Sequence, residues 1–383
     1  MKSATGLACV KDVNKDGRLL SLDVLRGFDM LFIMGGTTLV LDVIAAFGWR
    51  VEWVEVQLHH AAWHGLHFYD TIFPLFLFLA GVSWPFSLAK QRERGLLTSA
   101  IVRKIIRRGA VLSLLGFVYN GLLKLDFGNM VWGAVLTRIG IAWMIAALLS
   151  AFVQTCKLIL LSIIILLAYW GVCVFVAAPD APGLDPLSMC GCFAGWVDRA
   201  LMPGKLTHEG VISNQGILAT VPAVVTALLG VFSGKLLRRV DVCGLKKSVF
   251  LGIGAVVLLA LGFLMAYGFG RYSMPFNKVL WSSSFTLAVG GYSMGLLALF
   301  YWLIDVKGFR RWTLLFQVIG MNSITVYLAI RIMGFSSFAD FFFGGMANML
   351  PPAWGRVLLS GATLWFAWAF LYFLYRKKLF LRV

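Results

Sequence analysis

The sequence has little charge of either sign, and negative charge is especially scarce. Only 13% of its 383 residues are charged, with 17 Asp and Glu against 34 Lys and Arg. Hydrophobic residues make up 60% of the chain, and its mean hydropathy is +0.86. Soluble globular domains do not carry so large an apolar fraction. The composition therefore excludes an ordinary soluble enzyme and favours a chain embedded in a lipid bilayer.

Cysteine is also sparse, and nothing in the sequence looks like a cleavable signal peptide. Six cysteines are scattered along the chain, and Cys190 and Cys192 are too close together for an easy mutual disulfide. No further ligands stand at the usual zinc spacing, so we expect ordinary thiols and no metal site. Residues 1–18 are polar and basic without an apolar segment. They predict a short cytoplasmic leader.

Long apolar runs recur along the rest of the chain. A run of about 20 residues lets an α-helix cross the hydrocarbon core, where every backbone polar group must be paired within its own segment. We therefore expect an all-α polytopic membrane bundle forming one domain over 19–383. Ten spans are predicted, at 25–47, 69–90, 108–124, 131–152, 158–178, 214–234, 248–268, 279–303, 313–334 and 354–375. External loops are predicted at 48–68, 179–213 and 335–353, the second of them with one short helix.

The net charge of +17 is divided unevenly between the two predicted sides. The side with the leader, the tail and the loops after even-numbered spans holds 25 of the 34 Lys and Arg. Two more lie within spans, and the other side holds seven: Arg50, Lys124, Arg199, Lys205, Arg271, Lys278 and Arg356. By the positive-inside rule both termini are expected in the cytoplasm. This distribution explains the charge without a nucleic-acid partner.

Four of the five histidines fall within residues 59–70, which read HHAAWHGLHFYD and precede a long apolar run. Three interpretations compete. On a helix, His60, His64 and His67 would share one face and could bind a metal. Alternatively, the stretch is an interfacial belt of His, Trp and Tyr. We favour a catalytic histidine oriented by Asp70, because a neutral imidazole accepts a proton from an amine or hydroxyl near physiological pH.

Ionisable residues inside predicted spans are the other functional candidates, because burying a charge in the bilayer is costly unless it is paired or hydrated. Arg138 has two interpretations: an internal pair with an aspartate, or a contact with an anionic ligand inside the bundle. The candidates are Asp29, Asp42, Asp70, Arg138 and Arg331.

Several sequence blocks form a recognisable series. They lie at 18–27 (RLLSLDVLRG), 60–65 with Asp70 ten residues on, 73–83, 136–142 (LTRIGIA), 216–222, 275–284 (PFNKVLWSSS) and 320–324 (GMNSI). Together these blocks resemble the heparan-α-glucosaminide N-acetyltransferase family. They occur in the family's order and cover nearly all of the chain after the leader.

The resemblance implies transfer of acetyl from cytoplasmic acetyl-CoA to the amine of a terminal glucosamine on the external face. It implies that His60 is the base or the acetyl carrier and that Asp70 orients it. Candidate contacts with the cofactor are Arg138, Asn277, Lys278, Trp281 and Asn322, and candidate contacts with the substrate are Trp63, His64 and Asn214.

Two departures from the family leave the acceptor sugar open. The family usually has Asp-Pro-Glu-Gly where this chain has Ser213-Asn214-Gln215-Gly216, and His64 stands where lysosomal members have Asn. The shorter chain resembles a bacterial member of an inner membrane, and the Phe- and Gly-rich residues 341–345 are a candidate homodimer contact. The alternatives are a transporter of a sugar or lipid-linked sugar, and a non-enzymatic membrane scaffold. The sequence has no strong internal repeat, which argues against the transporter folds that are built from two inverted halves.

Overall fold

The computed structural model describes residues 19–381, so the predicted leader 1–18 lies outside the described range. Within that range the chain is all-α, with isolated β-bridges in place of strands, so the all-α part of the prediction is confirmed. The longer helices are α1 (Leu20–Leu31), α2 (Thr37–Ala46), α4 (Phe68–Glu93), α5 (Thr98–Tyr119), α6 (Val135–Phe152), α7 (Thr155–Phe175), α9 (Thr220–Arg238), α10 (Gly244–Tyr267), α11 (Ser283–Tyr301), α12 (Thr313–Met321), α13 (Ser323–Met333), α14 (Phe335–Met349) and α15 (Pro352–Arg376). Two short helices, α3 (Glu52–Gln57) and α8 (Phe193–Leu201), lie in connecting segments.

Eight helices within residues 19–381 are long and apolar enough to cross a membrane, and a ninth span results if α12 and α13 count as one. These two helices bend by 76° at Asn322. The expected span at 108–124 is not among them. Its helix, α5, begins ten residues earlier and carries Arg103, Lys104, Arg107 and Arg108 in its first half. Those four charges make every membrane-length window of α5 too polar.

The expectation of an external loop at 335–353 is wrong, because most of this segment forms helix α14. Gly334 ends α13 in a left-handed conformation (φ 58°), and the aromatic run that follows packs against α15. The ring of Phe342 lies 5.7 Å from that of Phe366, and Phe338 lies 6.3 Å from the same ring. Aromatic contacts therefore order a segment whose glycines suggested a loop. In the other long connection, 179–213, the single expected short helix is present as α8.

Helix α4 is the most buried of the candidate spans, and it packs along α9. A Cβ at Gly81 of α4 would overlap the backbone carbonyl of Ala227, and Cβ atoms at Gly230 and Gly234 would overlap the backbone of α4. Gly230 and Gly234 form a G-x-x-x-G motif, which lets two membrane helices approach closely. The close crossing fixes the position of α4, whose first turn carries Asp70.

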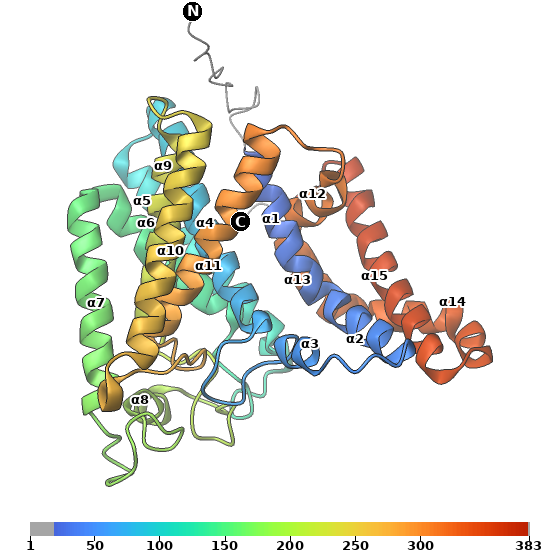
Figure 1. Ribbon diagram of the computed structural model, residues 1–383, viewed down its shortest axis with the longest axis horizontal. Helices are drawn as coiled ribbons and strands as arrows, with labels where there is room; N and C mark the ends of the chain where they lie inside the picture. The colour runs from blue at the N-terminus through green and yellow to red at the C-terminus, as the bar shows by residue number, and fades with distance from the viewer. Residues whose placement is uncertain (1–18, 382–383) are drawn as a thin grey trace, which may run out of the picture.

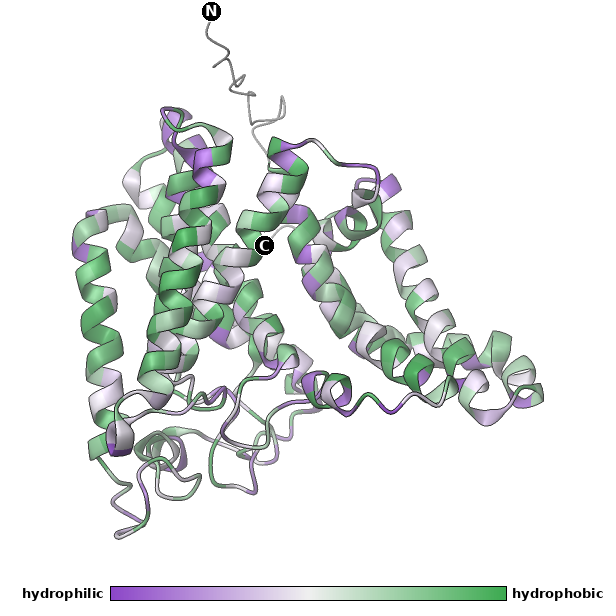
Figure 2. Cartoon of the chain, viewed as in Figure 1, coloured by the Kyte–Doolittle hydropathy of each residue, from purple (hydrophilic) through white to green (hydrophobic). Residues whose placement is uncertain are grey.

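The molecule has two polar faces separated by apolar helix bodies. Figure 1 shows the α4–α5, α9–α10 and α11–α12 connections at one end, and α3, α8 and the long irregular segments at the other. Figure 2 shows apolar residues along most of the helices between them. We call the first end, which also includes the α6–α7 connection, the basic face. We call the second end, formed by residues 47–67, 176–219 and 268–282, the loop face. The basic face corresponds to the side predicted to be cytoplasmic.

Candidate active site

The buried carboxylate of Asp70 connects the histidine-rich segment to the first turn of α4. Its Oδ2 accepts hydrogen bonds from the backbone N–H groups of Ala61 and His67, both at 3.2 Å. Its Oδ1 lies 2.7 Å from Nδ1 of His60. Backbone N–H groups at a helix start lack partners within the helix, so an acidic side chain there is favourable. The same carboxylate therefore caps the helix and holds the His60 ring.

Residues 58–67 are not helical, so the spacing of His60, His64 and His67 does not produce a shared helical face. Nδ1 of His67 lies 2.9 Å from the carbonyl oxygen of His59. His64 lies near Asp185, and burial lowers its pKa while that carboxylate partly opposes the effect. Among residues 19–381, no three His, Cys, Asp or Glu side chains are arranged to hold a metal ion. The metal-binding arrangement considered for these histidines is therefore not formed.

Lys278 completes a group of three ionisable side chains. Its Nζ lies 3.0 Å from Nδ1 and 3.2 Å from Nε2 of His60, and 3.4 Å from Oδ1 of Asp70. Burial lowers the pKa of Lys278, while the carboxylate of Asp70 acts in the opposite direction. Nδ1 of His60 is directed to the carboxylate, which leaves Nε2 as the nitrogen that can accept a proton.

Lys278 is held on a closely bonded turn between α10 and α11. The side-chain oxygen of Asn277 accepts the N–H of Leu280 at 2.9 Å, and the N–H of Asn277 donates to Oγ of Ser282 at 3.1 Å. Trp281 has a left-handed backbone (φ 52°), and its Nε1 donates to Thr226 at 3.1 Å. A large residue in this conformation persists only where its surroundings hold it in place. The turn therefore fixes the position of the lysine.

A cavity of about 370 Å³ opens beside these residues at the loop face. The His60 side chain is 52% exposed, whereas that of Asp70 is 1% exposed. Trp63 forms part of the wall, anchored by a 2.9 Å hydrogen bond from its Nε1 to the carbonyl of Leu187. His208 and Asn214 line another part and interact at 2.6 Å. The cavity thus combines an aromatic wall with amide and imidazole groups beside the proton-accepting nitrogen of His60.

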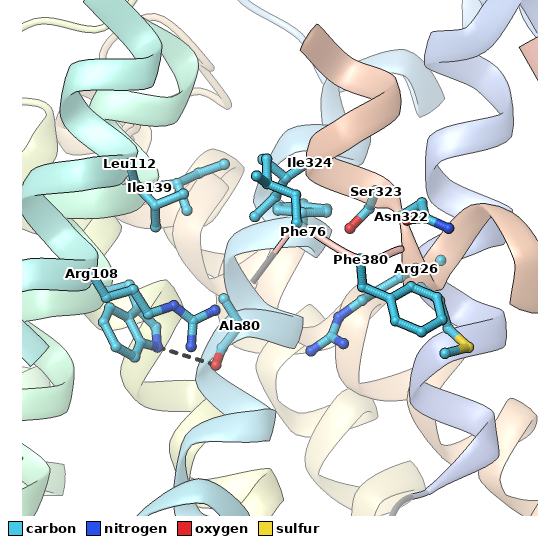
Figure 3. Close-up of a pocket in the computed structure, with 14 residues that line it drawn as sticks. Arg26, Phe76, Ala80, Arg108, Leu112, Ile139, Asn322, Ser323, Ile324 and Phe380 are labelled. Carbon is cyan, nitrogen blue, oxygen red and sulfur yellow. Dashed lines mark hydrogen bonds between the residues drawn. The ribbon is translucent and has the colours of Figure 1, made fainter. Parts of the chain in front are cut away.

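Three further cavities adjoin one another from this site to the basic face. An apolar constriction of about 30 Å³ shares Phe73 and Tyr327 with the loop-face cavity. It shares Phe76 and Ile324 with a cavity of about 230 Å³, shown in Figure 3. That cavity shares Arg108 with an open one of about 550 Å³ at the basic face. The four cavities, each sharing wall residues with the next, form a series between the two faces, which we call the path.

Opposing arginines mark the middle of this path. Figure 3 shows the guanidinium groups of Arg26 and Arg108 extending toward one another from two sides of the cavity, with Asn322 nearby. Arg26 bonds Ser83 and pairs with Asp23 at 3.4 Å. Asn322 is 2% exposed, and neither its side-chain oxygen nor its nitrogen has a hydrogen-bond partner. Buried polar atoms without partners are rare, so this position is suited to a polar ligand group.

The predicted site residues do not all lie at one site. His60, Asp70, Lys278, Trp63 and Asn214 surround the loop-face cavity, and Asn322 lies at the cavity of Figure 3. Asn277, Trp281 and Arg138 are buried behind the first site and line none of the cavities described above. The guanidinium of Arg138 lies 5.0 Å from the Trp281 ring and 3.5 Å from the carbonyl oxygen of Gly216. His64 lies 5.9 Å from Trp63, ring to ring, and does not line the cavity.

Sequence reasoning missed several residues that line the path. The ring of Tyr69 lies 4.7 Å from that of His60, and its place next to Asp70 was the available signal. Tyr327 and His208 come from distant segments, and no sequence pattern joined them to the site. Arg26 and Arg108 also line the path, and neither was among the predicted site residues.

No protein-family model matches the chain. It is 27% identical to the human heparan-α-glucosaminide N-acetyltransferase over 96% of its own length, and 26% identical to the mouse protein over 91%. The chain is a distant homologue of these acetyltransferases. It spans about three fifths of the length of each relative, 60% and 59% respectively. With eight or nine candidate spans, it is a multi-pass membrane protein.

Proposed function

We propose that the protein transfers an acetyl group from acetyl-CoA, bound from the basic face, to an amine at the loop face. The observation that carries this proposal is the path of adjoining cavities that ends at the His60–Asp70–Lys278 group. The distant homology to an N-acetyltransferase supports the same reaction class. The named relatives suggest a glucosamine end as acceptor, and we propose an amino sugar or oligosaccharide here.

The basic face suits the anionic nucleotide end of the donor. The open cavity there is lined by five cations, with no Asp or Glu in its wall: Lys90, Arg94, Lys104, Arg107 and Arg108. Phosphate oxygens pair well with such groups, particularly with arginine. From this cavity the pantetheine arm would pass Asn322, whose unpartnered amide can bond a peptide-like group. The thioester would then pass the apolar constriction and reach His60.

The chemistry at the loop face follows from the positions of three side chains. The acceptor nitrogen bonds to the thioester carbonyl carbon, and the carbon–sulfur bond breaks. Nε2 of His60 takes the proton from the amine, and that proton is returned to the leaving thiolate. Asp70 orients the ring through Nδ1 and stabilises its charged form. An alternative route, in which Nε2 first accepts the acetyl group and then passes it to the amine, uses the same residues.

Lys278 is positioned to stabilise the negative charge that develops on the thioester oxygen. Its ammonium group is held within 3.4 Å of Asp70 and beside the imidazole, on a turn with little freedom. A fixed donor at such a position stabilises the transition state more than the ground state. Asn277 and Trp281 would contribute indirectly by holding this turn, and Arg138 by packing beneath Trp281.

The test is acetyl-CoA consumption by the purified protein with and without glucosamine. We expect thiol release that requires the amine and that falls by roughly 10²–10⁴-fold in His60→Ala, the range for loss of a general base. The fold should persist, because the His60 side chain is half exposed. The neighbouring His59→Ala variant is the control, and it should retain activity. Amine-dependent thiol release that is undiminished in His60→Ala would contradict the assignment of the base.

A transporter remains the second candidate, because the α12–α13 break resembles the broken helices that form transporter binding sites. The two functions differ in a single measurement. In proteoliposomes, a transporter moves labelled glucosamine without consuming thioester. An acetyltransferase converts labelled glucosamine to its acetylated form, and the amount of this product equals the amount of thiol released.

A further inference from the structure

A second cationic cavity lies at the basic face, outside the path to His60. It has a volume of about 420 Å³ and is enclosed by the ends of α4 and α9 and by the α6–α7 connection. Its cations are Arg92, Lys235 and Arg238, and one acid, Glu93, also lines it. Trp84 is the one wall residue that it shares with the large basic cavity of the path.

Two of the three cations of this cavity are held by neutral groups. Arg92 donates to the carbonyl of Ala151 at 2.9 Å, and Lys235 donates to Oγ1 of Thr155 at 2.9 Å. Among the residues that the structure describes, no carboxylate lies within ion-pair distance of Arg92, Lys235 or Arg238. Three cations around one hollow with a single nearby acid leave a net positive site for an anion.

Part of the cavity wall is apolar, and an exposed apolar helix surface begins nearby. Leu88 and Val231 are buried in that wall, while Phe152 is 60% exposed. Along α7, which begins at this cavity, Leu160 and Ile163 are 58% and 50% exposed. A free phosphate would contact only the cations and leave such a surface uncovered. A molecule with an anionic head and long apolar chains would occupy both parts.

We propose that this cavity binds the headgroup of an anionic phospholipid, whose acyl chains lie along α7. Basic pockets between membrane helices at the cytoplasmic side are suited to phosphate headgroups. The site would join α4, which carries Asp70, to the ends of α6, α7 and α9 through one ligand. The proposal does not depend on acetyl transfer, since none of its cations lines the path to His60.

The test uses native mass spectrometry of the purified chain after exchange into mixed phosphatidylglycerol and phosphatidylcholine. We expect retained phosphatidylglycerol, with occupancy about tenfold or more lower in the triple variant Arg92→Gln, Lys235→Gln, Arg238→Gln. The matched control is Arg103→Gln, Lys246→Gln, Arg311→Gln, which removes the same charges from exposed positions outside the cavity. The control should keep the lipid. The single variant Lys235→Arg, which preserves charge, should also keep it.

Two outcomes would overturn the proposal. Equal loss of lipid in the control triple variant would show general attraction to a positive face without a specific site. Displacement of the lipid by 3′-phospho-ADP at stoichiometric amounts would instead make the cavity a nucleotide site. Acetyl transfer is measured on the same samples, so that failure of the proposed function is distinguished from failure of the lipid site. Thermal unfolding of each variant confirms that the fold is retained.

Discussion

At the scale of single residues, Lys278 has the most unusual surroundings of the side chains at the site. It is an amine placed against an imidazole and a carboxylate, where burial lowers its pKa. If its charged form stabilises the thioester oxygen, the rate depends on its proton. This proton is lost as the pH rises, at a pH below the ordinary range of lysine near 10.4.

We therefore expect the wild-type rate to fall on the alkaline side at a lower pH than an exposed lysine would give. Lys278→Met should lose this alkaline decline and be slower at neutral pH by roughly 10²-fold, the typical cost of one transition-state donor. The measurement is kcat/KM for acetyl-CoA against pH. Lys205→Met, an exposed lysine on the same face, is the control and should leave the profile unchanged. If Lys278→Met shows the same decline of kcat/KM at alkaline pH, the decline is caused by another ionisable group.

The pairing of His60 with Asp70 illustrates what the sequence can predict at this scale. Ten residues separate them, and one turn of coil followed by a helix start is enough to join them. Lys278 lies 218 positions from His60 and was a candidate only through resemblance. The shared helical face that the spacing of His60, His64 and His67 offered as one alternative is not formed, because Gly65 has a positive φ (143°) in a segment that does not form a helix. The contact between Lys278 and His60 depends on tertiary packing, and such long-range contacts leave no local sequence pattern.

At the scale of helices, the glycines at the α4–α9 crossing set the position of the site. Gly81→Ala would place a methyl group on the carbonyl of Ala227, so the two helices must separate. We expect a loss of stability of about 1–3 kcal/mol, as for overpacked interiors. The matched control is Gly252→Ala on α10, where nothing lies within 4 Å of the added carbon. Thermal unfolding in detergent should show a lower midpoint for Gly81→Ala and an equal or higher midpoint for Gly252→Ala.

Element boundaries show the limits of sequence interpretation at this scale. Apolar runs located most of the helices to within several residues, because hydropathy reports burial in lipid or protein alike. It did not locate α14, whose glycines and phenylalanines are compatible with either a loop or a helix until α15 is beside them. It also placed the start of α5 too late, since the basic first half of that helix reads as a loop when taken alone.

At the scale of the whole molecule, the proposed reaction requires one continuous route between the two faces. The narrowest part is the apolar constriction of about 30 Å³, and Ile324 lines both it and the cavity of Figure 3. Ile324→Trp should fill this part. We expect CoA binding at the basic face to change little, while acetyl transfer falls by about 10²-fold or more, because reactive groups must meet at close range.

The measurements are CoA binding by calorimetry and thiol release with glucosamine, on the same preparation. Ile163→Trp, on the half-exposed face of α7, is the matched control and should preserve both. Full transfer activity in Ile324→Trp would mean that the acetyl group takes another route. Loss of both CoA binding and acetyl transfer would indicate that tight binding of the donor also requires contacts at the constriction, beyond the arginines of the basic face.

The apolar lining of that constriction has a consequence for the membrane that contains the protein. A route that opens to admit a molecular arm is also a potential leak for protons and small ions, driven by the voltage across the bilayer. The residues lining the narrowest part are mostly aliphatic and aromatic, and the charged groups lie beyond it at either end. In the proposed reaction, this apolar segment would hinder the passage of ions while it is closed. It would let a group cross by covalent transfer while the cell's ion gradients stay intact.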